Sequence, residues 1–476
     1  MYTIRPMGLK EECGVFGVFG CKDAATLCYF GLYALQHRGQ EGAGIVSYDK
    51  KSFYVVKNKG LVSEVFNEEN LKYLKGKTAI GHVRYSTTGS HDINNIQPIY
   101  AKTSIGKIAI AHNGNLTNAL QLYKELESMG ALFQSTIDSE TMLHLVSRTK
   151  GKTVIDRFKS CLLRCEGAFS LTIMGDDFLM GARDPYGFRP LALGKLGSGY
   201  VLSSETCAFD LIGATYVRDI EPGEIVFIDK NGIQSHRIEK NVTPKQCIFE
   251  HIYFARPDSR VFGENVHEVR KALGRTLASE YPIEADIVIS VPDSGNSAAL
   301  GYAEASKIPF EFGITRNHYI GRTFIQPEQK IRDLNVKIKL NPIKASLKDK
   351  RVIVVDDSLV RGTTSKQRVS AIRKAGAKEV HLLISSPPIK APCHFGIDTP
   401  HKSKLIAANK SLEEVRQYVG ADSLGYISEK GLLDTVNAFP SNHYCTACFN
   451  GKYPIKVKNK GKHTVEQQKK IKFYQR

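Results

Sequence analysis

The chain has 476 residues, of which 42 % are apolar and 24 % charged, proportions that exclude disordered and fibrous classes of protein. No uninterrupted apolar run approaches the roughly 18 residues of a membrane-spanning helix, and residues 1–12 lack the apolar stretch of a secretory signal. The 10 cysteines are too sparse for a disulfide scaffold. We therefore expect a cytoplasmic protein in a reducing compartment, without a membrane partner.

The net charge is +18, and a positive charge of this size can indicate nucleic-acid binding. Whether it does so depends on where the basic residues lie in the chain. Residues 451–476 hold nine Lys and Arg side chains against one acid, so much of the excess belongs to a basic C-terminal tail. The sequence contains no zinc-finger spacing and no convincing helix-turn-helix or aromatic RNA-binding signature. We therefore expect no nucleic-acid partner.

The first half of the chain contains short strands clustered between helices. Strands are predicted at 14–20, 42–48, 52–58, 78–86 and 168–175, and helices at 25–36 and 118–128. Because the strands do not alternate regularly with helices, this pattern predicts an α+β domain with largely antiparallel sheets.

From about residue 250 apolar strands alternate with helices. Helices are predicted at 267–281, 298–306 and 365–376, and strands at 285–291, 351–357 and 379–385. This alternation predicts an α/β domain with a parallel, doubly wound sheet, which binds ligands beyond the carboxyl ends of its strands. We place the first domain at 13–240, the second at 250–450 and the basic tail at 451–476.

Two polar loops follow strands of this second domain. Asp356 and Asp357 end one strand, and such paired carboxylates suit ribose hydroxyls or Mg²⁺. The next residues supply backbone N–H groups, hydroxyls and the start of a helix, which together form a cradle for one phosphate; they are Arg361, Gly362, Thr363, Thr364 and Ser365. The loop 292–297 offers a second cradle, for a diphosphate. A helix cap and an ordinary turn are the alternative explanation for one loop alone.

The string VIVVDDSLVRGTTS resembles the phosphoribosyl-diphosphate loop of the type I phosphoribosyltransferases. The resemblance implies that Asp356, Asp357 and Ser294 meet the ribose, the diphosphate and one Mg²⁺, and that residues 361–365 hold the 5-phosphate. It also implies that Lys339 is a flap lysine that meets the diphosphate. The flap would be the basic segment 322–342, which a disordered linker would also explain.

A possible nucleophile, Cys13, precedes the first predicted strand, where a buried core cysteine is the plain alternative. Arg84 falls at a predicted strand end, Asn113 and Gly114 in a predicted turn, and Asp138 near the start of a predicted helix. Each of these positions taken singly has an ordinary structural explanation.

Their combination and order resemble the class II glutamine amidotransferases of the N-terminal-nucleophile family, which have an αββα fold. The motifs that carry the resemblance are ECGVFGVFG, ALQHRGQEGAGI, GHVRYSTTG, HNGNL, TIDSE and ARDPYGFRPL. The resemblance implies that Cys13 is the nucleophile and that Asn113 and Gly114 form the oxyanion hole. It implies that Arg84 binds the α-carboxylate of glutamine and Asp138 its α-ammonium group.

A thiol with an ordinary pKa near 8.5 needs a base to become a nucleophile. An α-amino group, with a pKa of about 7.7–8.0, suits that task near neutral pH. Only a cysteine at the chain terminus carries both groups on one residue. We therefore expect residues 1–12 to be removed as a propeptide, which would make Cys13 the first residue.

Together, the two halves resemble the glutamine-dependent phosphoribosyl-diphosphate amidotransferases over residues 13–455. The resemblance implies an enzyme with glutamine and 5-phosphoribosyl 1-diphosphate as substrates, in which ammonia passes internally between two sites. The product would be 5-phosphoribosylamine, the first committed intermediate of purine synthesis. The resemblance further implies inhibition by purine nucleotides and assembly as a homotetramer.

Two alternative functions would each explain only one half of the chain. A phosphoribosyl-binding transcription regulator would suit the positive charge but would leave Cys13 and Arg84 without a role. A sugar-phosphate transamidase would share the glutaminase half, but the string VVDDSLVRGTTS argues against it.

Four further cysteines lie outside the glutaminase half. Cys445 and Cys448 form a C-x-x-C pair in a predicted loop, Cys393 lies in APCHFGID, and Cys247 lies between the domains. Four thiolates suit zinc or an iron–sulfur cluster, and spacing does not decide between them. One branch of the resembled family carries a [4Fe–4S] cluster on cysteines in these contexts. The resemblance therefore implies such a cluster here, with a structural role.

Overall fold

The structure, a computed structural model, describes residues 13–85, 92–238, 241–317, 340–399 and 401–457. The predicted propeptide, Lys339, most of the predicted flap and most of the basic tail lie outside these residues. No helix in the described part of the chain combines the length and the apolar character needed to cross a membrane.

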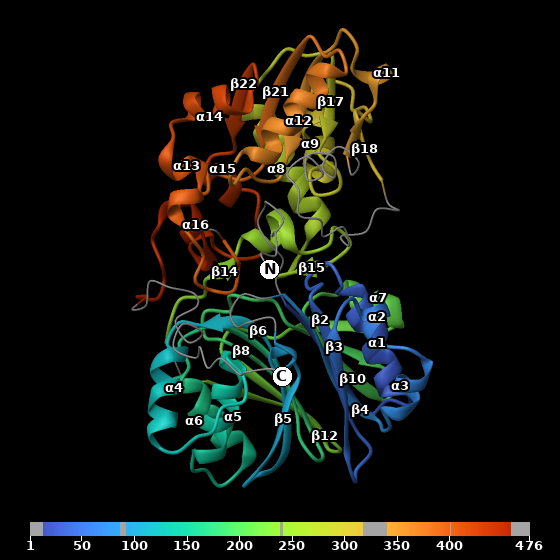
Figure 1. The fold of residues 1–476 in the computed structure, drawn as a ribbon, viewed down its shortest axis with the longest axis vertical. Helices are drawn as coiled ribbons and strands as arrows, with labels where there is room; N and C mark the ends of the chain where they lie inside the picture. Colours follow the sequence, from blue (N-terminus) through green and yellow to red (C-terminus); the bar gives the residue numbers. More distant parts are fainter. Residues whose placement is uncertain (1–12, 86–91, 239–240, 318–339, 400, 458–476) are drawn as a thin grey trace, which may run out of the picture.

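The first domain contains two antiparallel sheets (Figure 1). The seven-stranded sheet has the order β11-β9-β10-β1-β4-β2-β3, and the six-stranded sheet the order β13-β12-β8-β7-β6-β5. The strands of the first sheet are β1 (Gly14–Phe19), β2 (Gly42–Tyr48), β3 (Phe53–Lys59), β4 (Thr78–Arg84), β9 (Ala192–Leu196), β10 (Gly199–Ser203) and β11 (Thr215–Asp219). Those of the second are β5 (Ile99–Thr103), β6 (Gly106–Leu116), β7 (Gly167–Met174), β8 (Leu179–Arg183), β12 (Glu224–Asp229) and β13 (Gly232–Arg237).

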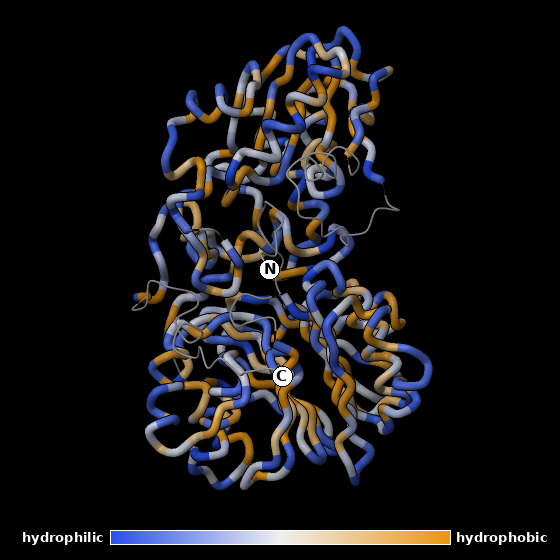
Figure 2. The backbone as a smooth tube through the Cα atoms, viewed as in Figure 1, coloured by the Kyte–Doolittle hydropathy of each residue, from blue (hydrophilic) through white to orange (hydrophobic). Residues whose placement is uncertain are grey.

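Three apolar cores arrange this domain as four layers. The middle core packs residues of both sheets together, among them Val15, Ile80, Ala109 and Val226. Figure 2 shows hydrophobic residues along the strands that face each other. The outer face of the first sheet is covered by α1 (Ala24–Ala34), α2 (Val62–Val65) and α7 (Cys207–Ile212), with α3 (Glu68–Tyr73) beside them. The outer face of the second is covered by α4 (Ala119–Ser128), α5 (Asp138–Arg148) and α6 (Val154–Arg164).

The second domain is built on a parallel sheet with the order β17-β20-β21-β22. Its strands are β17 (Ile287–Ser290), β20 (Arg351–Asp356), β21 (Glu379–Ile384) and β22 (Ser423–Tyr426). Alternate residues of β20 face opposite sides of the sheet, as the period of two in a strand requires. Ile353 and Val355 pack with α8 (Val266–Glu280) and α9 (Asn296–Ser306). Val352 and Val354 pack with α12 (Thr363–Lys374) and α14 (Leu412–Val419).

Shorter elements complete the second domain. They are β15 (Arg260–Val261), β16 (Glu264–Asn265), β18 (Ile314–Arg316), β19 (Leu340–Pro342), α11 (Lys344–Leu347), α13 (Ile406–Asn409) and α15 (Glu429–Leu433). Of the predicted flap, the structure describes only 340–342, which pair antiparallel with β18.

The two domains meet at a junction built from distant parts of the chain. β14 (Gln246–Cys247) pairs in parallel with β23 (Tyr444–Cys445), and α16 (Ala447–Asn450) follows. A π-helical segment, Glu250–Phe254, lies between β14 and β15. The large apolar core of the second domain also includes Ala168 and Phe188 from the first, so apolar packing continues across the junction.

Candidate functional sites

Cys13 and Arg84 lie at neighbouring strand ends. β1 begins directly after Cys13, and its residue Gly14 pairs with Val83 of β4, which ends at Arg84. The Cys13 Sγ donates a hydrogen bond to the carbonyl oxygen of Tyr85 at 3.3 Å. Burial raises the pKa of the thiol to about 11. The thiol is therefore neutral near neutral pH and needs a base before it can attack a substrate.

The prediction that Asn113 and Gly114 lie in a turn is wrong. Both residues belong to β6 and pair with β7, with Gly114 opposite Phe169. Gly114 has φ +150, and an added Cβ would lie 2.1 Å from the carbonyl oxygen of Ala168. The sequence pair Asn-Gly is typical of hairpin turns, but here glycine is required by the close approach of two strands.

The Asn113 side chain provides an unpaired donor. Asn113 is 1 % exposed, and its Nδ2 has no hydrogen-bond partner in the described part of the chain. Leaving a buried donor without a partner costs roughly 1–3 kcal/mol. Such a group is explained where a ligand supplies the missing acceptor.

Asp138 is the first residue of α5, as predicted, and its two oxygens have separate partners. Oδ2 accepts from the Leu116 N–H at 2.9 Å, and Oδ1 lies 3.1 Å from His112 Nδ1. Burial raises the pKa of Asp138, but the contacts with His112 and Leu116 outweigh it and hold the pKa below the ordinary value. Asp138 is therefore an ionised carboxylate, suited to an ammonium group.

Arg84 is 4 % exposed, and its Nη1 donates to the carbonyl oxygen of Asp92 at 3.4 Å. The charge of Arg84 lowers the pKa of the Cys13 thiol, whereas that of Asp138 raises it. The planar guanidinium suits a carboxylate, and one positive and one negative side chain therefore lie within electrostatic reach of Cys13.

In the second domain, the structure joins the two predicted phosphate loops. One follows β20 and contains Asp357, and the other follows the adjacent parallel strand β17 and contains Ser294. Ser294 Oγ donates to Asp357 Oδ1 at 2.6 Å. Gly295 fits against the other strand, because an added Cβ would lie 2.5 Å from the carbonyl oxygen of Val355.

The predicted 5-phosphate cradle lies at the N-terminus of α12. Gly362 precedes this helix with φ +76, and Thr363, Thr364 and Ser365 form its first turn. Arg361 Nε is buried without a hydrogen-bond partner in the described residues. A helix N-terminus and an arginine both favour an anion.

Sequence reasoning missed Arg368, which lies on α12 one turn after this cradle. Its Nη1 donates to Asp356 Oδ2 at 2.6 Å. Burial raises the pKa of Asp356 to about 7, and the charge of Arg368 opposes that rise. A single arginine inside a predicted helix gives no sequence signal of this contact.

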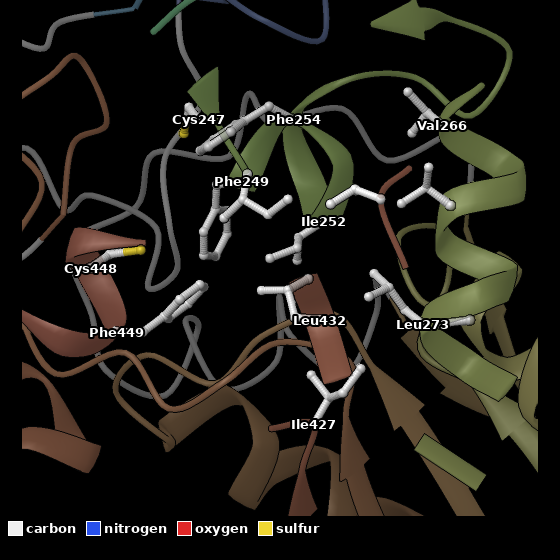
Figure 3. Close-up of a cluster of buried hydrophobic side chains, with 14 of the residues drawn as sticks. Cys247, Phe249, Ile252, Phe254, Val266, Leu273, Ile427, Leu432, Cys448 and Phe449 are labelled. Atoms are coloured by element: carbon white, nitrogen blue, oxygen red, sulfur yellow. The ribbon is translucent and has the colours of Figure 1, made fainter. Parts of the chain in front are cut away.

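The four cysteines predicted to act together gather at the junction between the domains. Cys247 pairs with Cys445 between β14 and β23, and Cys448 follows on α16. Burial raises the pKa of the Cys448 thiol, and the charges of Cys247, Cys445 and Cys393 raise it further. Figure 3 shows Cys247 and Cys448 beside the aromatic side chains of the junction core. The predicted loop for the C-x-x-C pair is corrected to a short strand and a helical turn.

None of the ten cysteines, all of which lie in the described part of the chain, forms a disulfide. Within the described ranges, the side chains of His, Cys, Asp and Glu nowhere converge in threes closely enough to form a closed metal site. The four cysteines supply the soft donors that zinc or an iron–sulfur cluster takes, and the other three lie near enough to Cys448 to affect its thiol electrostatically.

A buried network of charges also escaped the sequence analysis. It consists of two arginines and two glutamates, each at most 1 % exposed: Arg38, Arg189, Glu205 and Glu250. The signal was present, because these charged residues stand inside the strings ALQHRGQEGAGI, ARDPYGFRPL, SSET and CIFEHIYFARPDS. Charged residues of these kinds are almost never fully buried unless they are paired.

Two protein-family models match separate parts of the chain. Residues 82–210 match the glutamine amidotransferase domain, and residues 263–387 match the phosphoribosyl transferase domain. The chain is 49 % identical over 454 residues to the amidophosphoribosyltransferase of Bacillus subtilis, covering 94 % of this chain and 95 % of the relative. It is 50 % identical over 449 residues to amidophosphoribosyltransferase 1, chloroplastic, of Arabidopsis thaliana, covering 94 % and 79 %.

Two solved structures are similar over nearly the whole chain. One is glutamine phosphoribosylpyrophosphate amidotransferase from B. subtilis complexed with ADP and GMP, with a TM-score of 0.89, 48 % identity and coverage of 94 % and 98 %. The other is described as the allosteric regulatory enzyme of purine biosynthesis, with a TM-score of 0.90, 48 % identity and coverage of 94 % and 97 %. The predicted fold class, an N-terminal-nucleophile glutaminase domain followed by a type I phosphoribosyltransferase domain, is confirmed.

Proposed function

Because this chain belongs to the amidophosphoribosyltransferase family, we propose that it converts glutamine, water and 5-phosphoribosyl 1-diphosphate into 5-phosphoribosylamine, glutamate and diphosphate. This is the first committed step of purine synthesis. One observation carries the proposal: a single chain holds a buried Cys13 beside Arg84, and also two phosphate loops joined by Ser294 and Asp357.

In the first half-reaction, the Cys13 sulfur attacks the side-chain amide carbon of glutamine. Removal of residues 1–12 would expose the α-amine of Cys13, which takes the thiol proton and then gives it to the departing ammonia. Arg84 holds the α-carboxylate and Asp138 the α-ammonium group. Water then hydrolyses the thioester and releases glutamate.

The developing oxyanion needs donors that are in place before the reaction. The unpaired Asn113 Nδ2 and the Gly114 N–H are proposed to supply them.

In the second half-reaction, ammonia attacks C1 of the phosphoribosyl group and diphosphate leaves. Ammonia released into bulk water at neutral pH would become ammonium, which is not a nucleophile, so we propose transfer through the protein between the domains. The flap with Lys339 would close over the diphosphate.

Mg²⁺ is proposed to bind with Ser294, Asp356 and Asp357. These residues supply hard oxygen donors, of the kind that Mg²⁺ prefers, and Ser294 and Asp357 already lie in contact. When bound, the ion would stabilise charge on the departing diphosphate. Arg361, Gly362, Thr363, Thr364 and Ser365 would hold the 5-phosphate.

A [4Fe–4S] cluster is proposed to bind to Cys247, Cys393, Cys445 and Cys448, with a structural role at the junction. Soft thiolate donors suit both iron–sulfur clusters and zinc. The colour and the metal content of the purified protein distinguish the cluster from zinc. Protein purified without oxygen should be brown and contain about four irons per chain. A colourless protein with stoichiometric zinc would contradict the cluster.

The function is tested by product analysis with purified protein. Glutamine and 5-phosphoribosyl 1-diphosphate together with Mg²⁺ should give glutamate and diphosphate in equal amounts, and intact mass should show loss of residues 1–12. Absence of diphosphate release with either glutamine or ammonia would contradict the function. Inhibition by purine nucleoside monophosphates and assembly as a homotetramer are proposed as well, and are measured by the same assay and by light scattering.

A further inference from the structure

A segment of the second domain lies against the glutaminase site of the first. Asn115 Nδ2, beside the Asn113–Gly114 pair, donates to the carbonyl oxygen of His394 at 2.9 Å. An added Cβ on Gly396 would lie 3.3 Å from the Cα of Gly114. Residues 394–396 therefore touch the strand that carries the proposed oxyanion hole.

Arg189 fixes the middle of this segment. Its Nε and Nη2 both donate to the carbonyl oxygen of Phe395, at 3.1 and 2.9 Å. The ring of Phe395 stacks on Phe188 with centroids 4.2 Å apart and an interplanar angle of 13°. Arg189 is fully buried, so this contact is a built part of the junction and not a surface encounter.

One carboxylate links Arg189 to the residue of the nucleophile. Arg189 Nη1 lies 3.3 Å from Glu250 Oε1, and Arg38 Nη2 donates to the same oxygen at 2.7 Å. Arg38 Nε in turn donates to the carbonyl oxygen of Cys13 at 3.3 Å. Glu250 thus contacts two buried guanidinium groups. That of Arg38 donates to the Cys13 carbonyl oxygen, and that of Arg189 donates to the Phe395 carbonyl oxygen.

The other end of the segment is anchored at the cysteine site. The Phe395 N–H donates to Cys393 Sγ at 3.3 Å, and the Cys393 N–H donates to Thr399 Oγ1 at 2.6 Å. The segment is therefore held on both sides, by the cysteine-bearing loop of its own domain and by Arg189 of the other.

We propose that residues 394–396 are positioning residues for glutamine hydrolysis, acting on Asn113 and Gly114 through direct packing and on Cys13 through Arg189, Glu250 and Arg38. The second domain would thereby complete the active site of the first. This inference rests on the proposed function. Its physical basis is that oxyanion donors must lie within about 2.7–3.1 Å of the developing charge, and a displacement of about 1 Å can cost about 100-fold in rate.

The test compares two glycine variants with matched backbone strain. Gly396 has φ +112 and Gly232 has φ +109, but an added Cβ on Gly232 meets nothing within 4 Å. Gly396→Ala therefore adds both backbone strain and a close contact with Gly114 and Arg189. Gly232→Ala adds the backbone strain alone. We expect kcat for glutamine hydrolysis to fall about tenfold or more in Gly396→Ala, with KM within about twofold. Gly232→Ala should keep the kcat of the unchanged protein.

Two further measurements separate positioning from loss of the fold. Product formation with ammonia in place of glutamine should stay within about twofold in Gly396→Ala, because that reaction bypasses Cys13. Amide hydrogen exchange in a peptide that spans 110–118 should be faster in Gly396→Ala and unchanged in Gly232→Ala. Asn115→Ala, a milder change in the same contact, should lower kcat in the same direction.

Equal kcat and equal exchange in the two glycine variants would overturn the proposal, as would equal losses of glutamine- and ammonia-dependent activity. If the unchanged protein does not hydrolyse glutamine at all, the proposed function fails instead. The exchange comparison then still decides whether residues 394–396 hold the strand that contains Gly114.

Discussion

Ser294 donates a 2.6 Å hydrogen bond to Asp357, although the two residues are 63 positions apart in the chain. The bond joins the loops that follow two adjacent parallel strands. The diphosphate and ribose ends of the proposed substrate site are thus held at a fixed separation before the substrate binds, which lowers the entropic penalty of binding.

Removal of this hydroxyl should weaken substrate binding. We expect Ser294→Ala to raise KM for 5-phosphoribosyl 1-diphosphate about tenfold, since a hydrogen bond to a charged group contributes about 1.5–3 kcal/mol. Ser128→Ala is the control, because its hydroxyl bonds to a backbone carbonyl at an exposed position of α4. Initial-rate kinetics measure the change. An unaltered KM in Ser294→Ala would contradict the role of this contact.

Loss of the Cys13 sulfur should separate the two reactions. Cys13→Ala is expected to lower glutamine-dependent synthesis by about 1,000-fold or more, because the residual rate then rests on binding and the oxyanion donors, whereas ammonia-dependent synthesis continues. Cys21→Ala is a matched control, since Cys21 is 8 % exposed and Cys13 is 7 % exposed. Product assays with each nitrogen donor measure the split, and equal losses with both donors would exclude Cys13 as the nucleophile.

The buried Arg38 should contribute far more stability than an exposed ion pair. Arg38→Met leaves the carboxylates of Glu205 and Glu250 without one of their cations, and breaking such a buried pair costs about 3–5 kcal/mol. Lys72→Met breaks an exposed pair with Glu68 on α3 and should cost less than about 0.5 kcal/mol. Thermal or denaturant unfolding measures both changes, and similar midpoints in the two variants would contradict the expectation.

The buried His251 should make stability depend on pH. Burial lowers its pKa to about 4, and neither ring nitrogen has a hydrogen-bond partner among the residues described. The unfolded chain, with a histidine pKa of about 6.5, therefore binds the proton more readily between about pH 4 and 6.5. Stability should be fully present above pH 6.5 and should fall as the pH drops toward 4, by up to roughly 3 kcal/mol.

Unfolding midpoints between pH 4.5 and 7 test this expectation. His251→Phe should flatten the loss of stability at low pH, whereas His401→Phe, at an exposed position, should leave it unchanged. The buried His82, whose pKa burial lowers to about 3, acts in the same direction. It therefore keeps part of the dependence in the His251 variant. A steeper dependence in His251→Phe would contradict the sign of the effect.

The periodic parts of the molecule could be predicted from sequence, because strand and helix patterns reflect local packing. The strand that ends at Asp356 and the helix that begins at Asp138 were both predicted from such patterns. Asn113 and Gly114 were misplaced in a turn, because their pairing with β7 depends on residues more than 50 positions away. The ion-pair partners of Arg368 and Glu250 could not be assigned, because the sequence does not show which charged side chains lie next to each other in the fold.

The pairing of Arg38 with Glu250 has a consequence for how the protein is made. On the ribosome, Arg38 is synthesised more than 200 residues before Glu250, whereas its other buried partner, Glu205, belongs to the first domain. A nascent chain that ends before residue 250 therefore holds Arg38, which donates to the carbonyl oxygen of Cys13, with at most one of its two carboxylate partners. We therefore expect the surroundings of Cys13 to take their final arrangement only after the residues of the junction have been synthesised.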